Sequence, residues 1–218
     1  MFEAVIFDMD GVLIDSETLH IQLEEDIFKE IGANISFEEH ISFVGTTSHY
    51  MWEYVKNKCN VPFTVEELVE MDRKRYFDYI SKHDDAVKPI VGVDELVKEL
   101  HKRNMRLAVA SSSPIDVIEI VVKRLKLENY FDELVSGDFV KRSKPYPDIF
   151  LYAAEKLNVA PERCIVIEDS NKGVLAAKSA GMKVVGFINP NSGNQDISMA
   201  DMEIRSFSEL DYEKLQNI

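Results

Sequence analysis

The sequence contains few cysteines, and this shortage excludes several classes of protein. Cys59 and Cys164 are its only two. They are too few for a disulfide framework, and they lack the paired spacing of a cysteine metal site. Cys164 opens an apolar run and is expected in the core. We therefore expect a protein of a reducing compartment and predict a cytoplasmic localisation.

Basic residues are also scarce compared with acidic ones. Lys and Arg together number 25 against 39 Asp and Glu, which leaves a net charge of −14. Such a charge repels polyanions, so we expect neither nucleic acid nor an anionic membrane as a partner. An anionic small substrate would be repelled too. A phosphate site in this chain therefore needs local attraction from a metal ion, a lysine or helix N-termini.

Long hydrophobic runs, a basic leader and tandem repeats are missing as well. The chain passes from Met1 almost directly into the short apolar run 4–7, and no stretch approaches the length of a membrane span. No contiguous aromatic stripe suggests a partner surface, so we expect a monomer.

Short apolar runs that end abruptly in polar residues are present at 4–7, 107–110, 165–167 and 184–187. These runs are typical of strands buried on both faces, and helical periodicity separates the later ones. Ser113 is expected to cap one helix with Pro114 at its first position, and Gly181 to end another that begins near Asn171. This alternation predicts an α/β fold with a parallel sheet and helices on both faces.

Residues 15–88 break the alternation, because helical patterns follow one another there without a convincing strand. The first helix places Leu19, Leu23 and Ile27 on one face and is expected to stop at Gly32. Capping boxes at Ser36 with Glu39 and at Thr64 with Glu67 start later helices. We predict a core formed by 1–14 and 89–218 and an inserted helical domain formed by 15–88.

Polar residues directly after the predicted strands carry the chemistry, because ligands of an open parallel sheet bind beyond the carboxyl ends of its strands. Asp8 and Asp10 are separated by one residue, and Gly11 allows a sharp turn that points both carboxylates into one space. Asp8 could attack phosphorus. Asp10 could protonate the departing alkoxide and then accept a proton from the attacking water.

A second acidic pair, Glu168 and Asp169, follows another predicted strand. With Asp8, these hard oxygen ligands could hold an octahedral Mg²⁺. Lys144, in a loop stiffened by two prolines, adds a positive charge, and Ser111 could donate a hydrogen bond to a phosphoryl oxygen. Each residue alone could be an ordinary helix cap, turn former or solvated charge. Their convergence on one sheet edge favours catalysis.

The stretches 8–13 (DMDGVL), Ser111, Lys144 with Pro145, and 168–170 (EDS) resemble the four ordered motifs of the haloacid dehalogenase superfamily. The segments 7–16, 144–148 and 168–174 more narrowly resemble the β-phosphoglucomutase-like phosphatases of that superfamily. The resemblance spans nearly the whole chain.

This resemblance implies a Rossmann-like core with a helical cap domain inserted after the first strand. It also implies that Asp8 is the nucleophile, that Asp10 is the acid and base, and that Asp8, Asp169 and the carbonyl of Asp10 hold Mg²⁺. Relatives differ in whether the carboxylate at the position of Glu168 touches the ion directly or through water. Asp10 argues against the dehalogenase branch, because a halide leaving group needs no proton.

The cap is expected to choose the leaving group of the substrate, because the core recognises only the phosphoryl group. The sequence predicts a set of substrate-binding residues drawn from both parts of the chain: Gly11, His20, Gly45, Thr46, Thr47, Lys74, Ser112 and Asn171. The related mutases place an Arg a few residues after a cap Gly to grip a second phosphate. Thr46, Thr47, Ser48 and His49 follow Gly45 here.

The predicted function is therefore a Mg²⁺-dependent phosphatase of small phosphomonoesters, with sugar phosphates as the favoured class. A mutase of the β-phosphoglucomutase type is the alternative within the same chemistry. A non-catalytic phosphate-binding or regulatory protein, or a phosphoacceptor switch, is the alternative from another class. Asp10 and the helical insert argue against this last class, because a hydrolase of this kind needs such an insert to exclude water until the aspartyl phosphate has formed.

Overall fold

The computed structural model describes residues 1–44 and 47–218, and the chain divides into two compact units. One unit comprises Met1–Asp15 and Val87–Ile218, and the other comprises Ser16–Ala86. Along the described residues, no helix is both long enough and apolar enough to cross a membrane.

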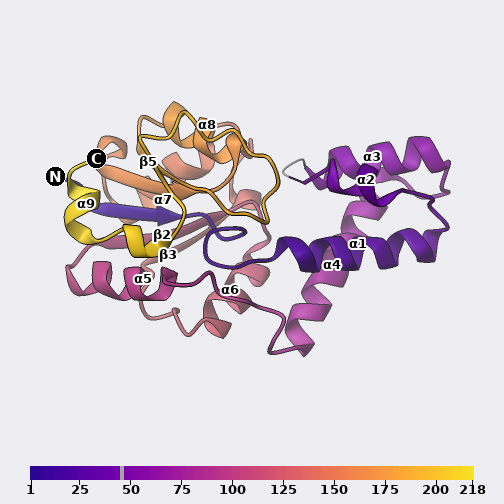
Figure 1. Ribbon diagram of the computed structural model, residues 1–218, viewed down its shortest axis with the longest axis horizontal. Helices are drawn as coiled ribbons and strands as arrows, with labels where there is room; N and C mark the ends of the chain where they lie inside the picture. The colour runs from indigo at the N-terminus through magenta and orange to yellow at the C-terminus, as the bar shows by residue number, and fades with distance from the viewer. Residues whose placement is uncertain (45–46) are drawn as a thin grey trace. The chain divides into compact units, whose positions relative to one another are not determined.

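The first unit is built on a six-stranded sheet in the order β3-β2-β1-β4-β5-β6, with every neighbouring pair parallel (Figure 1). Its strands are β1 (Ala4–Phe7), β2 (Arg106–Ser111), β3 (Glu133–Ser136), β4 (Cys164–Glu168), β5 (Lys183–Phe187) and β6 (Met202–Ile204). β1 and β4 are buried along their whole length, as expected for parallel strands covered on both faces. The predicted α/β class is confirmed.

Two edge strands, β3 and β6, are not among the strands predicted from the sequence. β3 begins with Glu133, and β6 contains the exposed Glu203, so neither forms an uninterrupted apolar run. An edge strand has a neighbour on one side only and is often short. Its sequence signal is correspondingly weak.

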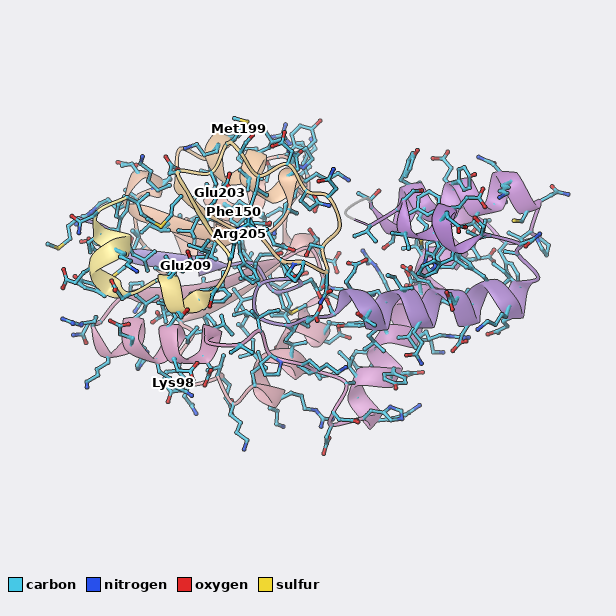
Figure 2. All side chains as sticks on the ribbon, viewed as in Figure 1. Lys98, Phe150, Met199, Glu203, Arg205 and Glu209 are labelled. Atoms are coloured by element: carbon cyan, nitrogen blue, oxygen red, sulfur yellow. The ribbon has the colours of Figure 1, made fainter. Side chains whose placement is uncertain are left out.

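Helices cover both faces of the sheet (Figure 1). Inward residues of β1, β2 and β4 form one buried cluster with α7 (Asp148–Leu157) and α8 (Asn171–Ser179). α5 (Val93–Lys102) contacts β2, and α6 (Ile115–Arg124) contacts β3. The remaining elements of this unit are η1 (Gly137–Phe139), η2 (Pro161–Arg163), η3 (Phe207–Glu209) and α9 (Tyr212–Gln216). Phe150 of α7, labelled in Figure 2, is fully buried in this core.

The start of α6 differs from the sequence prediction. Pro114 occupies the N-cap position and the helix begins at Ile115, with no side chain capping it. The Ser113 hydroxyl instead donates a hydrogen bond to Asp10 Oδ2 over 3.0 Å. The predicted end of α8 is correct, because the helix stops at Ser179 and Gly181 adopts a left-handed φ of 77°.

The second unit contains helices α1 (Glu17–Ile31), α2 (Phe37–Ile41), α3 (Ser48–Cys59) and α4 (Val65–Lys82). Its hydrophobic core surrounds Trp52, which is fully buried beside Phe28 and Leu68. α1 ends at Gly32, and both predicted capping boxes are present, at Ser36 with Glu39 and at Thr64 with Glu67.

A buried acid accompanies this apolar core. The Trp52 indole donates a hydrogen bond to Asp72 Oδ2 over 3.0 Å. Burial, followed by the negative charge of Glu24, raises the pKa of Asp72 to about 6. Glu24 in turn lies 2.6 Å from Nε2 of the buried His40. The interior of the second unit therefore contains the ionisable side chains of Asp72 and His40 beside its apolar core.

Candidate active site

The carboxyl ends of the central strands bring the predicted catalytic residues to one edge of the sheet. Phe7 is in register with Val109 of β2 and with Ile167 of β4. The backbone N–H of Asp8 then donates to the Ile167 carbonyl over 3.0 Å, so the sheet ladder extends to this aspartate. Asp8 therefore stands directly beside the acidic pair that ends β4.

Asp8, Glu168 and Asp169 form a buried acidic cluster. One carboxylate oxygen from each lies within 4.8 Å of the others. Burial, together with the charges of Glu168 and Asp10, raises the pKa of Asp8 to about 7 although Lys144 opposes the shift. Burial, then the charges of Glu168 and Asp8, raises the pKa of Asp169 well above its ordinary value. Positive charge beside the cluster therefore favours the ionised forms of Asp8 and Asp169.

Lys144 supplies part of that positive charge. Its Nζ lies 2.6 Å from Asp8 Oδ1, 2.7 Å from Glu168 Oε1 and 3.2 Å from the Ala110 carbonyl oxygen. Burial lowers the pKa of the ammonium, but attraction to Asp8 and Glu168 outweighs it, so the net pKa lies above the ordinary value. Lys144 is thus held as a cation between two carboxylates.

Glu168 is enclosed by the start of α8. The backbone N–H and the hydroxyl of Ser170 both donate to Glu168 Oε2, over 2.9 and 2.8 Å. A Cβ atom added to Gly173 would lie 1.7 Å from Glu168 Oε1. Glycine at position 173 is therefore required for the carboxylate to occupy this place.

Asp10 lies in the turn after β1, where two serines reach it. Ser113 Oγ donates to Asp10 Oδ2 over 3.0 Å, and Ser111 Oγ lies 3.5 Å from the same oxygen. Gly11 has a φ of 79°, and a Cβ atom there would lie 2.0 Å from Asp169 Oδ2. The backbone of the turn after β1 thus lies close to the Asp169 side chain, which leaves no room for a side chain at Gly11.

The structure brings Asp8, Asp10, Gly11, Ser111, Lys144, Glu168 and Asp169 together as the sequence predicts. Ser112 and Asn171 face other groups. The Ser112 hydroxyl is exposed and pairs with that of Ser143 over 3.1 Å. The Asn171 side chain donates to the Asp196 carbonyl over 2.6 Å. Their roles in substrate binding stay predictions.

The other predicted substrate-binding residues belong to the second unit or to its undescribed part. Gly45 and Thr46 lie outside the described residues. The Thr47 side chain caps α3 by accepting a hydrogen bond from Tyr50 N over 3.2 Å. The His20 ring stacks on Tyr76 at 4.1 Å, and Lys74 is exposed on α4. Their contribution to substrate binding stays a prediction.

Three residues around the cluster are not among the site residues predicted from the sequence. Ser113 resembles a helix cap in the sequence, but its hydroxyl turns to Asp10. Gly173 lies within the segment 168–174, which carries one of the motifs. A glycine in the first turn of a helix that follows a buried acid is the sequence signal for this close packing. Ser192 donates to Asp169 Oδ2 from a loop without any recognisable pattern.

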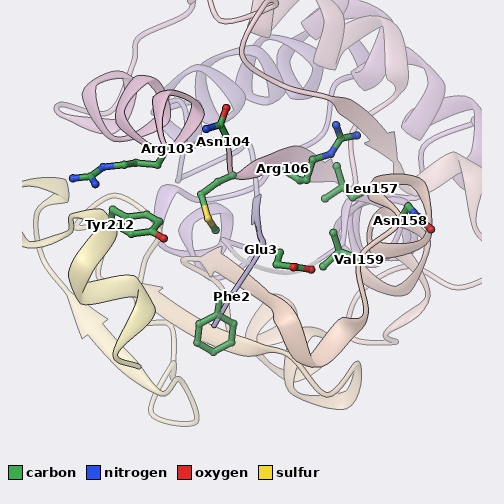
Figure 3. Close-up of a pocket in the computed structure, with 10 residues that line it drawn as sticks. Phe2, Glu3, Arg103, Asn104, Arg106, Leu157, Asn158, Val159 and Tyr212 are labelled. Atoms are coloured by element: carbon green, nitrogen blue, oxygen red, sulfur yellow. The ribbon is translucent and has the colours of Figure 1, made fainter.

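A pocket of about 580 Å³ lies at the opposite end of the sheet (Figure 3). Phe2 and Glu3, which precede β1, line it with Arg106, the first residue of β2. Since these positions mark the amino ends of parallel strands, the pocket is separate from the acidic cluster at their carboxyl ends.

Comparison with known proteins agrees with this geometry. The family model described as haloacid dehalogenase-like hydrolase matches residues 5–187. A phosphorylated carbohydrates phosphatase of Thermotoga maritima is 36% identical over 184 residues, which cover 83% of this chain and 82% of that protein. Hexitol phosphatase B of Escherichia coli is 32% identical over 213 residues, which cover 95% and 93% of the two chains.

A solved structure is similar over the full length. The β-phosphoglucomutase of Clostridium difficile superposes with a TM-score of 0.81 at 28% identity, covering 100% of this chain and 96% of that one. The likeness therefore includes the residues of both units.

Proposed function

The chain belongs to the haloacid dehalogenase-like hydrolase family, and from this we propose that it hydrolyses small phosphomonoesters through a phosphoryl group carried transiently on Asp8. It is a phosphoric monoester hydrolase, as the sequence predicts and as its phosphatase relatives indicate. The observation that carries the mechanism is the position of Asp8, which lies 2.6 Å from Lys144 inside a cluster of carboxylates. Residues 1–14 and 89–218 then form the catalytic core, and 15–88 form the cap domain.

The first step uses Asp8 and Asp10 in different roles. A carboxylate oxygen of Asp8 forms a bond to phosphorus while the bond from phosphorus to the leaving oxygen breaks. Asp10 gives its proton to that leaving oxygen, and the alcohol departs. Lys144 and Ser111 are close enough to Asp8 and Asp10 to stabilise the charge on the phosphoryl oxygens.

The second step restores the resting enzyme. A water molecule attacks phosphorus, and Asp10, now a carboxylate, takes its proton. The bond between phosphorus and the Asp8 oxygen breaks, so inorganic phosphate leaves and the Asp8 carboxylate is regenerated. Ser113 holds the Asp10 side chain by donating to Oδ2 over 3.0 Å, which supports its reuse in both steps.

The acidic cluster fits a divalent metal ion, and we propose Mg²⁺. Three buried carboxylates surround the Lys144 ammonium, and burial, together with repulsion from the neighbouring carboxylates, raises the pKa values of Asp8 and Asp169. Bound there, the ion would neutralise negative charge and orient the phosphoryl group. Asp8, Asp169 and the Asp10 carbonyl would hold it. Both oxygens of Glu168 already accept hydrogen bonds, from Lys144 and Ser170, which supports a less direct contact for this residue.

Sugar phosphates are the proposed substrate class. The relatives named above act, by their names, on phosphorylated carbohydrates and hexitol phosphates. The absence of an Arg in the stretch 46–49 after Gly45 favours hydrolysis over transfer between two phosphate positions. The mutase stays the second candidate, because the C. difficile enzyme shares the fold over the full length.

Phosphate release from a panel of sugar phosphates, with Mg²⁺ and with EDTA, tests the proposal. Asp8→Asn should abolish release because an amide does not attack phosphorus, whereas the exposed Asp85→Asn should leave it unchanged. Turnover by Asp8→Asn at the wild-type rate would refute the mechanism. Rapid conversion of β-glucose 1-phosphate to glucose 6-phosphate with a trace of 1,6-bisphosphate, and with little free phosphate, would identify a mutase instead.

A further inference from the structure

The loop between β5 and β6 binds both chain segments that carry the acidic cluster. Its residues 189–196, named here the 189–196 loop, hydrogen-bond to the turn after β1 and to the end of β4. The loop is not part of the motifs that carry the catalytic residues. Its contacts converge on Gly11 and Asp169.

Ser192 makes the contact nearest to the cluster. Its hydroxyl donates to Asp169 Oδ2, and the serine and the aspartate are only 9% and 6% exposed. A Cβ atom on Gly11 would lie 3.0 Å from Ser192 Oγ and 2.0 Å from Asp169 Oδ2. The Ser192 hydroxyl and the Asp169 carboxylate therefore pack closely against each other and against the Gly11 backbone.

Asn189 of the same loop binds the backbone of Gly11. Its Nδ2 donates to the Gly11 carbonyl over 2.9 Å, and its Oδ1 accepts from Asn191 N over 2.9 Å. Asn191 Nδ2 donates further to Asp15 Oδ2 over 2.8 Å. Both ends of the Asn189 amide are thus used, which fixes the loop against the turn after β1.

Gln195 connects the same loop to the start of α8. Its Nε2 donates to the Ser192 carbonyl over 3.1 Å, while its Oε1 accepts from Asn171 N over 3.1 Å. The Asn171 side chain donates to the Asp196 carbonyl over 2.6 Å. The backbone that carries Ser192 is therefore held from two directions, so the position of its hydroxyl is determined by the fold.

We propose that Ser192 is a positioning residue for Asp169 and sets the affinity of the acidic cluster for Mg²⁺. This inference rests on the proposed function, in which Asp169 holds the ion. A hydrogen bond to one oxygen fixes the rotation of a carboxylate, and residues that orient metal-binding carboxylates strongly affect metal affinity. A hydroxyl donor also offsets part of the cost of burying the charged form.

Isothermal titration of the substrate-free chain with MgCl₂, after removal of metals with EDTA, tests the proposal. Ser192→Ala should bind Mg²⁺ about tenfold more weakly or worse, the range found for residues that orient metal ligands. Ser198→Ala is the matched control, because its hydroxyl also donates to an aspartate of the same loop region, Asp196, over 2.6 Å but away from the cluster. This control should bind Mg²⁺ like the wild type.

Phosphate release as a function of Mg²⁺ concentration gives a second readout. For Ser192→Ala, half-maximal activity should require more Mg²⁺, while kcat at saturating Mg²⁺ should return close to the wild-type value. If Ser192→Ala does not fold, Ser192→Cys decides the question, because its thiol has a similar shape but is a weak donor and should also weaken binding.

The outcomes separate this inference from the proposed function. A wild-type chain that binds Mg²⁺, together with a folded Ser192→Ala or Ser192→Cys variant of equal affinity, would overturn the role of Ser192 alone. A wild-type chain that binds no divalent cation would overturn the metal site itself, and the role of Ser192 with it.

Discussion

The Lys144 ammonium lies between two carboxylates, 2.6 Å from Asp8 Oδ1 and 2.7 Å from Glu168 Oε1. It therefore offsets part of the negative charge of the proposed nucleophile and of one neighbouring acid at the same time. Its side chain is 8% exposed, so water screens this attraction only weakly.

Replacing Lys144 by Ala should impair both stability and catalysis. The substitution leaves two buried carboxylates without their cation, a change that typically costs about 3 kcal/mol or more of unfolding free energy. The rate of phosphate release should fall by about 100-fold or more, because a donor to the transition state is lost. Urea unfolding in EDTA and steady-state kinetics measure the two effects. The exposed Lys141→Ala serves as control, and a Lys144→Ala variant that matched it in both assays would contradict this account.

Replacing Gly173 by Ala should destabilise the protein although glycine is a poor helix former. In an exposed helix the change would add roughly 1 kcal/mol of unfolding free energy. Here the new Cβ would lie 1.7 Å from Glu168 Oε1, so the carboxylate or the helix must move. We expect a lower melting temperature and slower phosphate release. Ser179→Ala, at an exposed position of the same helix, provides the comparison.

The metal-free protein should become less stable as the pH rises from about 4 to 8. The pKa of Asp8 is about 7 in the folded chain and near 3.8 in the unfolded one. The unfolded chain therefore loses its proton first, and stability falls as the pH passes through the folded value. Melting temperatures in EDTA across this range measure the effect. Asp8→Asn should flatten the curve, because asparagine does not titrate.

Mg²⁺ should counteract this loss, because the ion binds the deprotonated carboxylates. The gain in melting temperature on adding MgCl₂ should therefore be larger at pH 8 than at pH 5. A gain that shrank with rising pH would contradict the assignment of Asp8 and Asp169 to the ion.

Ionisation of Asp72 should be visible in the fluorescence of Trp52. This indole is the only tryptophan in the sequence, and it donates to Asp72 Oδ2 over 3.0 Å. Because burial, followed by the charge of Glu24, raises the pKa of Asp72 to about 6, we expect a fluorescence transition near that pH. Asp72→Asn should remove the transition, whereas Asp85→Asn should retain it. Its persistence in Asp72→Asn would assign it to another group.

Loss of Asp10 should depend on the leaving group. Asp10→Ala should slow the hydrolysis of sugar phosphates by about 100-fold or more, because their alkoxides need a proton. Aryl phosphates, whose leaving groups depart without protonation, should lose much less. Equal losses for both substrate types, measured as kcat/KM, would remove the acid role of Asp10. Ser113→Ala should show the same preference at smaller magnitude, since its hydroxyl holds Asp10 Oδ2.

The sequence predicts the residues at the sheet edge because parallel strands impose a simple geometry. Asp8 and Glu168 come at the ends of two apolar runs, and neighbouring parallel strands place such ends together. Residues that reach the site from loops follow no such rule. Ser192 is 23 residues from Asp169, and its hydrogen bond depends on the path of the chain after β5.

Local patterns are also ambiguous when two hydrogen-bond partners compete for one side chain. A serine before a proline at the start of a helix is typical of a cap, and Ser113 fits that pattern. Its hydroxyl serves Asp10 instead, because the turn after β1 brings that carboxylate within 3.0 Å. Only the tertiary structure decides between these partners.

The backbone hydrogen bond from Asp8 to Ile167 gives the two proposed catalytic aspartates different backbone surroundings. Asp8 is held in the ladder of a six-stranded sheet, whose distortion would disturb the core of the first unit. Asp10 lies two residues further, in a turn closed by the hydrogen bond from Gly11 N to the Ile14 carbonyl. The proposed nucleophile is thus placed by the sheet ladder, whereas the proposed proton donor is placed by the hydrogen bonds of the turn and by Ser113. In the proposed mechanism, a substitution that alters this turn should change proton transfer more than nucleophilic attack.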